Sequence, residues 1–125
     1  AVCLGSLSYQ LRDVIDALRE EGVPVGVAGL RLYRPFPDEA VSAALGGKKG
    51  VVVFEKAVSY GYEGPLFADI KAALYENENR PFVHNYILGL GGREIKTEDL
   101  IEAMKTSCAA DKDFGREPKF IGLRF

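Results

Sequence analysis

The hydrophobic residues of this chain follow two patterns that alternate along its length. Apolar residues three and four positions apart, the spacing of one helix face, predict helices whose inward faces lie at 7–18, 41–45, 66–74 and 100–108. Short apolar runs between these segments predict strands at 1–5, 25–33, 51–54 and 82–88. A last short run at 120–123 adds a predicted edge strand.

The order of these segments predicts the fold class. Strand and helix alternate four times with connections of a few residues, which predicts right-handed crossovers and a mostly parallel sheet of about five strands. Val51–Phe54 is apolar without interruption, as in a strand covered by helices on both faces. No internal repeat or low-complexity linker divides the chain. We therefore expect residues 1–125 to form one α/β domain, a three-layer α/β/α sandwich.

Residues suited to helix ends support this order of elements. Ser6 or Ser8 is a suitable N-cap for the first helix, and Gly22 is a suitable stop. Pro37, followed by two acidic residues, suits the first turn of the second helix. Thr97 is the expected cap of the last helix.

Composition and charge narrow the functional classes. Hydrophobic residues make up 47% and charged residues 27%, which is typical of a globular domain. Sixteen Lys and Arg are interleaved with eighteen acids for a net charge of −2, so no nucleic-acid surface is predicted. No apolar stretch has the ~20 residues that cross a bilayer, and no signal peptide is predicted.

The two cysteines predict no metal site. Cys3 lies in a predicted strand and Cys108 near a predicted helix end, without the spacing of an iron–sulfur or zinc motif. A disulfide between them stays open, and a reduced, cytoplasmic setting is the simpler interpretation. The chain begins without Met inside a predicted strand, and we expect it to be a fragment of a longer subunit.

Candidate chemistry is concentrated where the strands end. In parallel α/β sheets, ligands usually bind beyond the carboxyl ends of the strands. Those ends lead into loops rich in Gly, Pro and charge, at residues 5–6, 34–37, 55–64 and 89–93. The candidates for interface or ligand contacts at this edge are Arg31, Arg34, Tyr60, Gly61, Tyr62, Gly64, Gly89, Gly91, Gly92 and Arg93.

The glycine loop Gly89–Arg93 is more typical of a turn or an interface than of a phosphate site. Glu94 occupies the sixth position, where a dinucleotide fingerprint has a small residue, and the loop follows a late strand. Gly46–Lys49 also lacks the features of a P-loop, because a strand follows it and not a helix. Three glycines do allow tight turns and a close approach of another chain.

Single side chains leave alternatives open. Arg34 can bind a carboxylate or phosphate, or form a structural ion pair with Asp38 or Glu39. His84, the only histidine, is better interpreted as a packed strand residue than as a general base. Tyr60 and Tyr62 flank Gly61, and suit an interface contact or ordinary packing equally.

Two acidic residues and the absence of known catalytic motifs bear on whether this chain is catalytic. Glu55 ends a strand where thiamine enzymes can use a carboxylate, and Glu63 lies just before a helix N-terminus. The sequence contains no Gly-Asp-Gly motif for a metal diphosphate, no cysteine cluster, no nucleophile elbow and no HExxH. We therefore predict no catalytic residue and no metal ligand on this chain.

Three separated motifs resemble a known family. Leu30–Pro37, Val51–Gly64 and Gly89–Ile95, in this order and spacing, resemble the C-terminal region of the α subunit of pyruvate:ferredoxin oxidoreductases. The ending Phe120–Arg124 is similar as well. The family often has Asp-Arg where this chain has Glu55-Lys56, and Asp where it has Glu94. These departures conserve the charge at those positions.

The resemblance implies a fold and a function. The fold would be like the C-terminal domain of transketolase, with one antiparallel strand in a mostly parallel sheet. The family's enzymes oxidatively decarboxylate a 2-oxoacid with coenzyme A, using thiamine diphosphate with Mg and passing electrons through iron–sulfur clusters to ferredoxin. Other domains and subunits hold these cofactors, so this domain would bind none of them.

Three functions compete. The first is a structural and assembly domain of such an oxidoreductase, with its loops contacting the thiamine-binding domains. The second is a ligand-binding domain, in which Arg34, Arg93 and the glycine loop hold a phosphate-bearing cofactor such as coenzyme A. The third is a separate flavodoxin-like or receiver-like module, which the absence of an acidic cluster or a hydroxyl-rich loop after Gly5–Ser6 disfavours.

Overall fold

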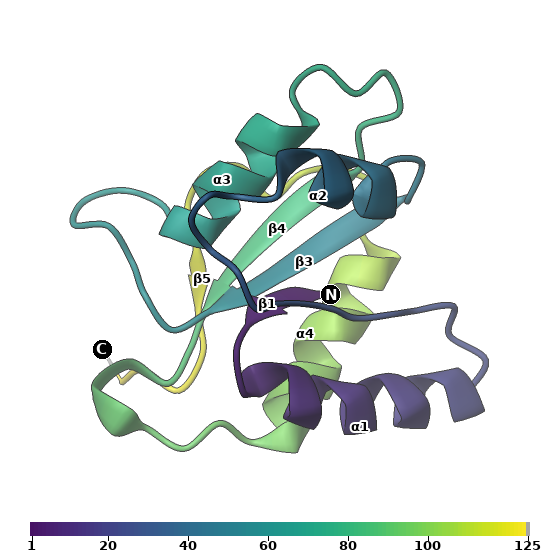
Figure 1. The fold of residues 1–125 in the computed structure, drawn as a ribbon. Coiled ribbons are helices and arrows are strands. Elements are labelled where there is room, and N and C mark those ends of the chain that lie inside the picture. The colour runs from purple at the N-terminus through teal and green to yellow at the C-terminus, as the bar shows by residue number, and fades with distance from the viewer. Residues whose placement is uncertain (125) are drawn as a thin grey trace.

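The structure is a computed structural model that describes residues 1–124. Its elements follow the predicted order of strands and helices (Figure 1). In chain order they are β1 (Val2–Leu4), α1 (Leu7–Glu20), β2 (Ala28–Leu30), α2 (Asp38–Leu45), β3 (Gly50–Glu55), α3 (Pro65–Leu74), β4 (Phe82–Ile87), the 3₁₀ turn η1 (Leu90–Gly92), α4 (Thr97–Ala109) and β5 (Lys119–Phe120).

Within residues 1–124 the strands form one five-stranded sheet in the order β2-β1-β3-β4-β5. All of its strand pairs are parallel, which confirms the predicted α/β class. The expectation of one antiparallel strand is wrong. Helix α4 returns the chain to the amino edge of the sheet, so that β5 then runs alongside β4 in the same direction, with Ile87 opposite Phe120.

Two hydrophobic cores separate the three layers. Helices α1 and α4 cover one face of the sheet, and α2 and α3 cover the other (Figure 1). Alternate residues of a strand point to opposite faces. In β3, Val52 and Phe54 therefore pack against α1 and α4, while Val51 and Val53 pack against α2 and α3. This double burial explains the uninterrupted apolar run.

Two local predictions need correction. The strand predicted over 25–33 is only Ala28–Leu30 long, because β2 lies at the sheet edge and its ladder pairs solely with the three residues of β1. Thr97 does not cap α4; it is the first helical residue, and Lys96 precedes it without a capping side-chain bond. Ser6 occupies the N-cap position of α1, also without such a bond.

The segment after α4 lies along β4. The backbone N–H of Val83 donates to the Asp113 carboxylate at 2.9 Å, and the N–H of Ile121 donates to the carbonyl of Ile87 at 2.8 Å. Between these two points the ring of Phe114 stacks on His84, with 3.7 Å between ring centroids. Residues 113–121 are therefore part of the sheet's structure along the side of β4 that faces away from β3.

Candidate functional site

The carboxyl edge of the sheet carries most of the predicted candidates, on two loops. The loop after β3 (residues 56–64) and the loop after β4 (residues 88–96) both leave the sheet at this edge (Figure 1). They lie side by side there, since a side-chain carbon added to Gly89 would lie 3.6 Å from Cγ of Lys56. The strand order reverses between β1 and β3, so the end of β3 lies at the topological switch point of the sheet.

Glu55 anchors the first of these loops from inside the protein. Its side chain is 5% exposed. The carboxylate accepts hydrogen bonds from the backbone N–H groups of Leu66 and Phe67, at 2.9 and 3.0 Å, in the first turn of α3. It also accepts one from the Asn85 side-chain amide at 2.9 Å. A carboxylate here is favourable because it satisfies free N–H groups at the positive end of the helix dipole.

The buried position of Glu55 raises its pKa, and its carboxylate leaves no room for a side chain at position 64. Burial raises the pKa of the Glu55 carboxyl above its ordinary value, outweighing the hydrogen bonds from Leu66, Phe67 and Asn85, which lower it. A Cβ atom at Gly64 would lie 2.0 Å from the carboxylate oxygen Oε2. The backbone is held in place there, because the N–H of Gly64 donates to Oδ1 of Asn85 at 3.0 Å. Since it cannot move away to make room for a Cβ atom, only glycine fits at position 64.

Glu63 is a second buried acid, and it directly precedes Gly64 in the chain. Its side chain is 2% exposed and pairs with Lys71 at 2.8 Å and with Arg116 at 3.4 Å. Arg116 also donates to the hydroxyl of Tyr62 and lies over that ring. The sequence-based description of Glu63 as a simple acid before a helix missed this role, since Arg116 is 53 residues away along the chain.

These anchors hold a loop whose tip is exposed. Gly61 has a φ of +66°, a conformation that favours glycine, and the N–H of Tyr62 donates to the carbonyl of Ser59 at 2.9 Å. Tyr60 lies between Ser59 and Gly61, and its side chain is fully exposed. Tyr62 is 52% exposed and is held by Arg116, so of the two predicted tyrosines Tyr60 is the free one.

The two arginines predicted after β2 have different environments. Arg34 pairs with Asp69 of α3 at 3.0 Å and lies over the Tyr33 ring, whose hydroxyl donates to the same carboxylate oxygen at 2.5 Å. A structural ion pair was one of the two alternatives left open, with Asp38 or Glu39 as the expected partner; the partner comes instead from α3. Arg31 is exposed and lines a shallow groove of about 230 Å³ between β2 and α2.

The glycine loop after β4 has the geometry of a compact turn. Gly89, Gly91 and Gly92 all have positive φ values, between 66° and 75°. Arg93 donates to the carbonyl of Gly122 at 3.1 Å, which ties the loop to the end of the described chain. The glycines are therefore required by the backbone here, whatever the loop contacts.

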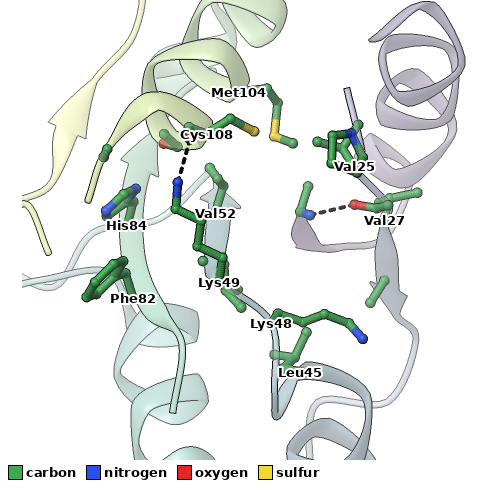
Figure 2. A pocket seen from close by; sticks show the side chains of 18 of the residues that line it. Val25, Val27, Leu45, Lys48, Lys49, Val52, Phe82, His84, Met104 and Cys108 are labelled. Carbon is green, nitrogen blue, oxygen red and sulfur yellow. Dashed lines mark hydrogen bonds between the residues drawn. The ribbon is translucent and has the colours of Figure 1, made fainter. Parts of the chain in front are cut away.

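The opposite, amino edge of the sheet contains a cavity that the sequence did not predict. It has a volume of about 500 Å³, and its walls come from α2, α4, β3, β4 and the segment before β2 (Figure 2). Most of the walls are apolar, with Val25, Val27 and Leu45 around one part and Met104 and Cys108 around another. Lys49 crosses the wall and donates to the carbonyl of Cys108 at 3.2 Å.

His84 is packed in the wall of this cavity. It is 1% exposed, and its Nε2 lies 3.1 Å from the carbonyl of Lys112, so Nε2 carries the proton. Its Nδ1 has no hydrogen-bond partner within the described part of the chain. Burial lowers the pKa of His84 below its ordinary value. This neutral, stacked histidine agrees with the packed strand residue expected from the sequence.

Cys3 is buried, Cys108 is half-buried, and neither forms a disulfide within residues 1–124. The same residues contain no group of three or more His, Cys, Asp or Glu side chains arranged to hold a metal ion. None of the helices described is long and apolar enough to span a membrane.

Comparison with known proteins gives the family. The family model for "Pyruvate:ferredoxin oxidoreductase core domain II" matches residues 1–100. The chain is 42% identical over 123 residues to pyruvate synthase subunit PorA of Thermotoga maritima, covering 98% of this chain and 31% of that protein. It is 41% identical over 124 residues to ketoisovalerate oxidoreductase subunit VorA of Pyrococcus abyssi, covering 97% of this chain and 31% of the relative.

The relatives are much longer than this chain, which spans about a third of their length. Pyruvate synthase subunit PorA of Methanosarcina barkeri, 34% identical over 125 residues, is matched over the same 31% share. The predicted resemblance to 2-oxoacid:ferredoxin oxidoreductases is thereby confirmed at the level of the subunit family. The chain belongs to the pyruvate:ferredoxin oxidoreductase core domain II family.

Proposed function

We propose that this chain is a structural and assembly domain in the α subunit of a pyruvate:ferredoxin oxidoreductase, at its C-terminal end, with a fold like the C-terminal domain of transketolase. The intact enzyme decarboxylates pyruvate oxidatively to acetyl-coenzyme A and passes electrons to ferredoxin in the cytoplasm. Thiamine diphosphate, Mg and iron–sulfur clusters belong to other domains and subunits. The carboxyl-edge loops of this domain contact the thiamine-binding part.

The observation that carries the proposal is the exposed tip of residues 58–62 on a rigid base. Two buried acids and Asn85 fix both ends of the loop, whereas Tyr60 is fully exposed and Val58 is 37% exposed. An aromatic side chain on a rigid support loses little entropy on binding and is typical of interface contacts. Because Tyr60 adds nothing to the core, stabilisation of the fold does not explain this loop, and contact with another domain explains it better.

The anion-binding capacity of this edge is largely used by the protein itself, which favours assembly over coenzyme binding. The N-terminus of α3 would suit a phosphate, but its N–H groups at Leu66 and Phe67 already bind the Glu55 carboxylate. The guanidinium of Arg34, a candidate phosphate ligand, is paired with Asp69. A phosphate at either place would have to displace a carboxylate.

The test uses the intact subunit co-expressed with the other subunits of the enzyme. Tyr60→Ser is expected to weaken recovery of the partner subunits by affinity capture and to shift the complex to smaller sizes in gel filtration. Tyr75→Ser is the matched control, since Tyr75 is 73% exposed but follows α3 at the far end of that helix. Equal recovery of partners with both variants would refute the docking role.

A further inference from the structure

The buried carboxylate of Glu63 has two cationic partners, which is one more than its charge requires. Lys71 of α3 pairs with the carboxylate oxygen Oε2 at 2.8 Å, and Arg116 pairs with the same oxygen at 3.4 Å. The closer pair already balances the charge of Glu63. The positive charge of Arg116 is therefore in excess at the end of the loop after β3.

The guanidinium of Arg116 is fixed in place but still largely open to solvent. It donates to the hydroxyl of Tyr62, and its central carbon lies 4.7 Å from the centroid of that ring. The side chain of Arg116 is nevertheless 66% exposed. A guanidinium has five N–H donors, and the bonds to Glu63 and Tyr62 use one each. A charged group that is both oriented and exposed is suited to pair with an anion from outside the domain.

Lys56 adds a second exposed cation to the same loop. It directly follows β3, and it has no ion-pair partner within residues 1–124. Residues 57–62 contain no acid, and the first turn of α3 contains none either. The only acid of the loop is Glu63, which is buried. The loop therefore presents positive charge without an exposed acid of its own.

Hydrophobic side chains lie between these two cations along the loop. Val58 is 37% exposed, Tyr60 is fully exposed and Tyr62 is 52% exposed. Protein interfaces commonly have aromatic side chains at the centre and charged ones at the rim. Tyr and Arg are also enriched among the residues that dominate binding energy. Residues 56–62 and Arg116 thus form a contact surface with an apolar centre and a positive rim.

We infer that the partner surface that receives Tyr60 is acidic, with carboxylates that pair with Arg116 and Lys56. The inference rests on the proposed function and adds the chemistry of the partner, a neighbouring domain or subunit of the same enzyme. A phosphate-bearing ligand would match the charge of this surface but not its exposure. Bound small molecules are enclosed on most sides, whereas Tyr60 is fully exposed.

Carbodiimide cross-linking of the intact, assembled enzyme tests the inference directly. The reagent joins an amine to a carboxylate where the two are in contact, and mass spectrometry identifies the joined peptides. Lys56 should be joined to an Asp or Glu outside residues 1–125. In Arg116→Lys, which keeps the charge, position 116 should give a second cross-link of this kind. The absence of cross-links from both positions, or cross-links only to acids of this domain, would overturn the inference.

A charge reversal gives an independent test in the affinity capture of the partner subunits. Lys56→Glu should raise the apparent dissociation constant about fivefold at ~0.1 M salt, because an attraction becomes a repulsion. At ~1 M salt, where the screening length is ~3 Å, the difference from the parent should fall below about twofold. Lys112→Glu is the matched control, since Lys112 is exposed, lies in the same segment as Arg116 and has no ion-pair partner in the part of the chain that the structure describes. Equal capture with both variants at the lower salt concentration would contradict the inference.

The outcomes separate this inference from the proposed function. If Tyr60→Ser leaves the capture unchanged, the docking role itself fails. If Tyr60→Ser weakens the capture and Lys56→Glu does not, the docking role stands and the acidic partner surface is wrong. Loss of the Lys56 cross-link on addition of coenzyme A would assign the anion to that ligand and would also overturn the inference.

Discussion

Replacing Glu55 by alanine tests the buried hydrogen bonds that hold the base of the exposed loop. The substitution removes the acceptor of three bonds of 2.9–3.0 Å and leaves two backbone N–H groups and one amide without it. Each unsatisfied buried donor costs ~1–3 kcal/mol, and water entering the vacated space reduces this cost. We therefore expect the free energy of unfolding to fall by about 3 kcal/mol, the low end of the sum.

Urea unfolding of the chain followed by circular dichroism measures this loss. With a slope of about 1.5 kcal/mol per molar urea, the midpoint should fall by about 2 M. Gly64→Ala should have a similar effect, because the new Cβ would displace the same carboxylate. Gly50→Ala is the matched control, since its nearest non-neighbouring atom, the Phe82 carbonyl oxygen, lies at 3.8 Å.

The double variant decides whether this reasoning is correct. Once Glu55 is alanine, the space beside Gly64 is open, so Gly64→Ala should add less than about 1 kcal/mol to the loss, a coupling of roughly 2 kcal/mol. Full additivity of the two losses would refute the steric argument. A midpoint unchanged in Glu55→Ala would refute the assigned hydrogen bonds.

The pH dependence of Glu55→Gln has a definite sign. Because the pKa of Glu55 is raised in the folded protein, the folded state binds a proton more readily than the unfolded chain just above pH 4.5. The parent chain should therefore gain stability relative to Glu55→Gln as the pH falls from 7 through the folded pKa. A constant difference between the two proteins over this range would contradict the raised pKa.

Three further predictions follow from buried side chains. Lys71→Met should lower the free energy of unfolding by about 2 kcal/mol, measured in urea, because it takes a partner from the buried Glu63; no change would contradict the pairing. Burial lowers the pKa of His84, so the melting temperature of the parent chain should fall relative to that of His84→Leu as the pH is lowered from 7.5 to 5. A difference in melting temperature that stays constant over this range would disprove the lowered pKa. Burial raises the pKa of Cys3 to about 11, so its thiol should resist Ellman's reagent at pH 8 until the chain unfolds.

The sequence predicted the elements whose signal is local. The helix faces and the apolar run of β3 are set by residues within one turn or one strand, and they appear where expected. The length of β2 could not be predicted, because it depends on the extent of its neighbour β1. The partner of Arg34 was missed for the same reason, since Asp69 is 35 residues away.

The candidate site was predicted in part. Parallel topology alone places the loops after β3 and β4 at one edge, and they do lie side by side there. The buried network was not predicted, because Glu55 reaches Asn85 across the sheet and Glu63 reaches Arg116 from the distant tail. The amino-edge cavity has no sequence motif at all, since its walls come from short pieces of several elements.

The segment after α4 has a consequence for how the domain is made. It supplies the partners of Val83 and Ile87 and the ring that covers His84. A ribosome releases these residues after all other strands, so β4 must wait as an open sheet edge during synthesis. Folding of the nascent domain should therefore become complete only when residue 121 has left the exit tunnel, which sets a late window for chaperone contact.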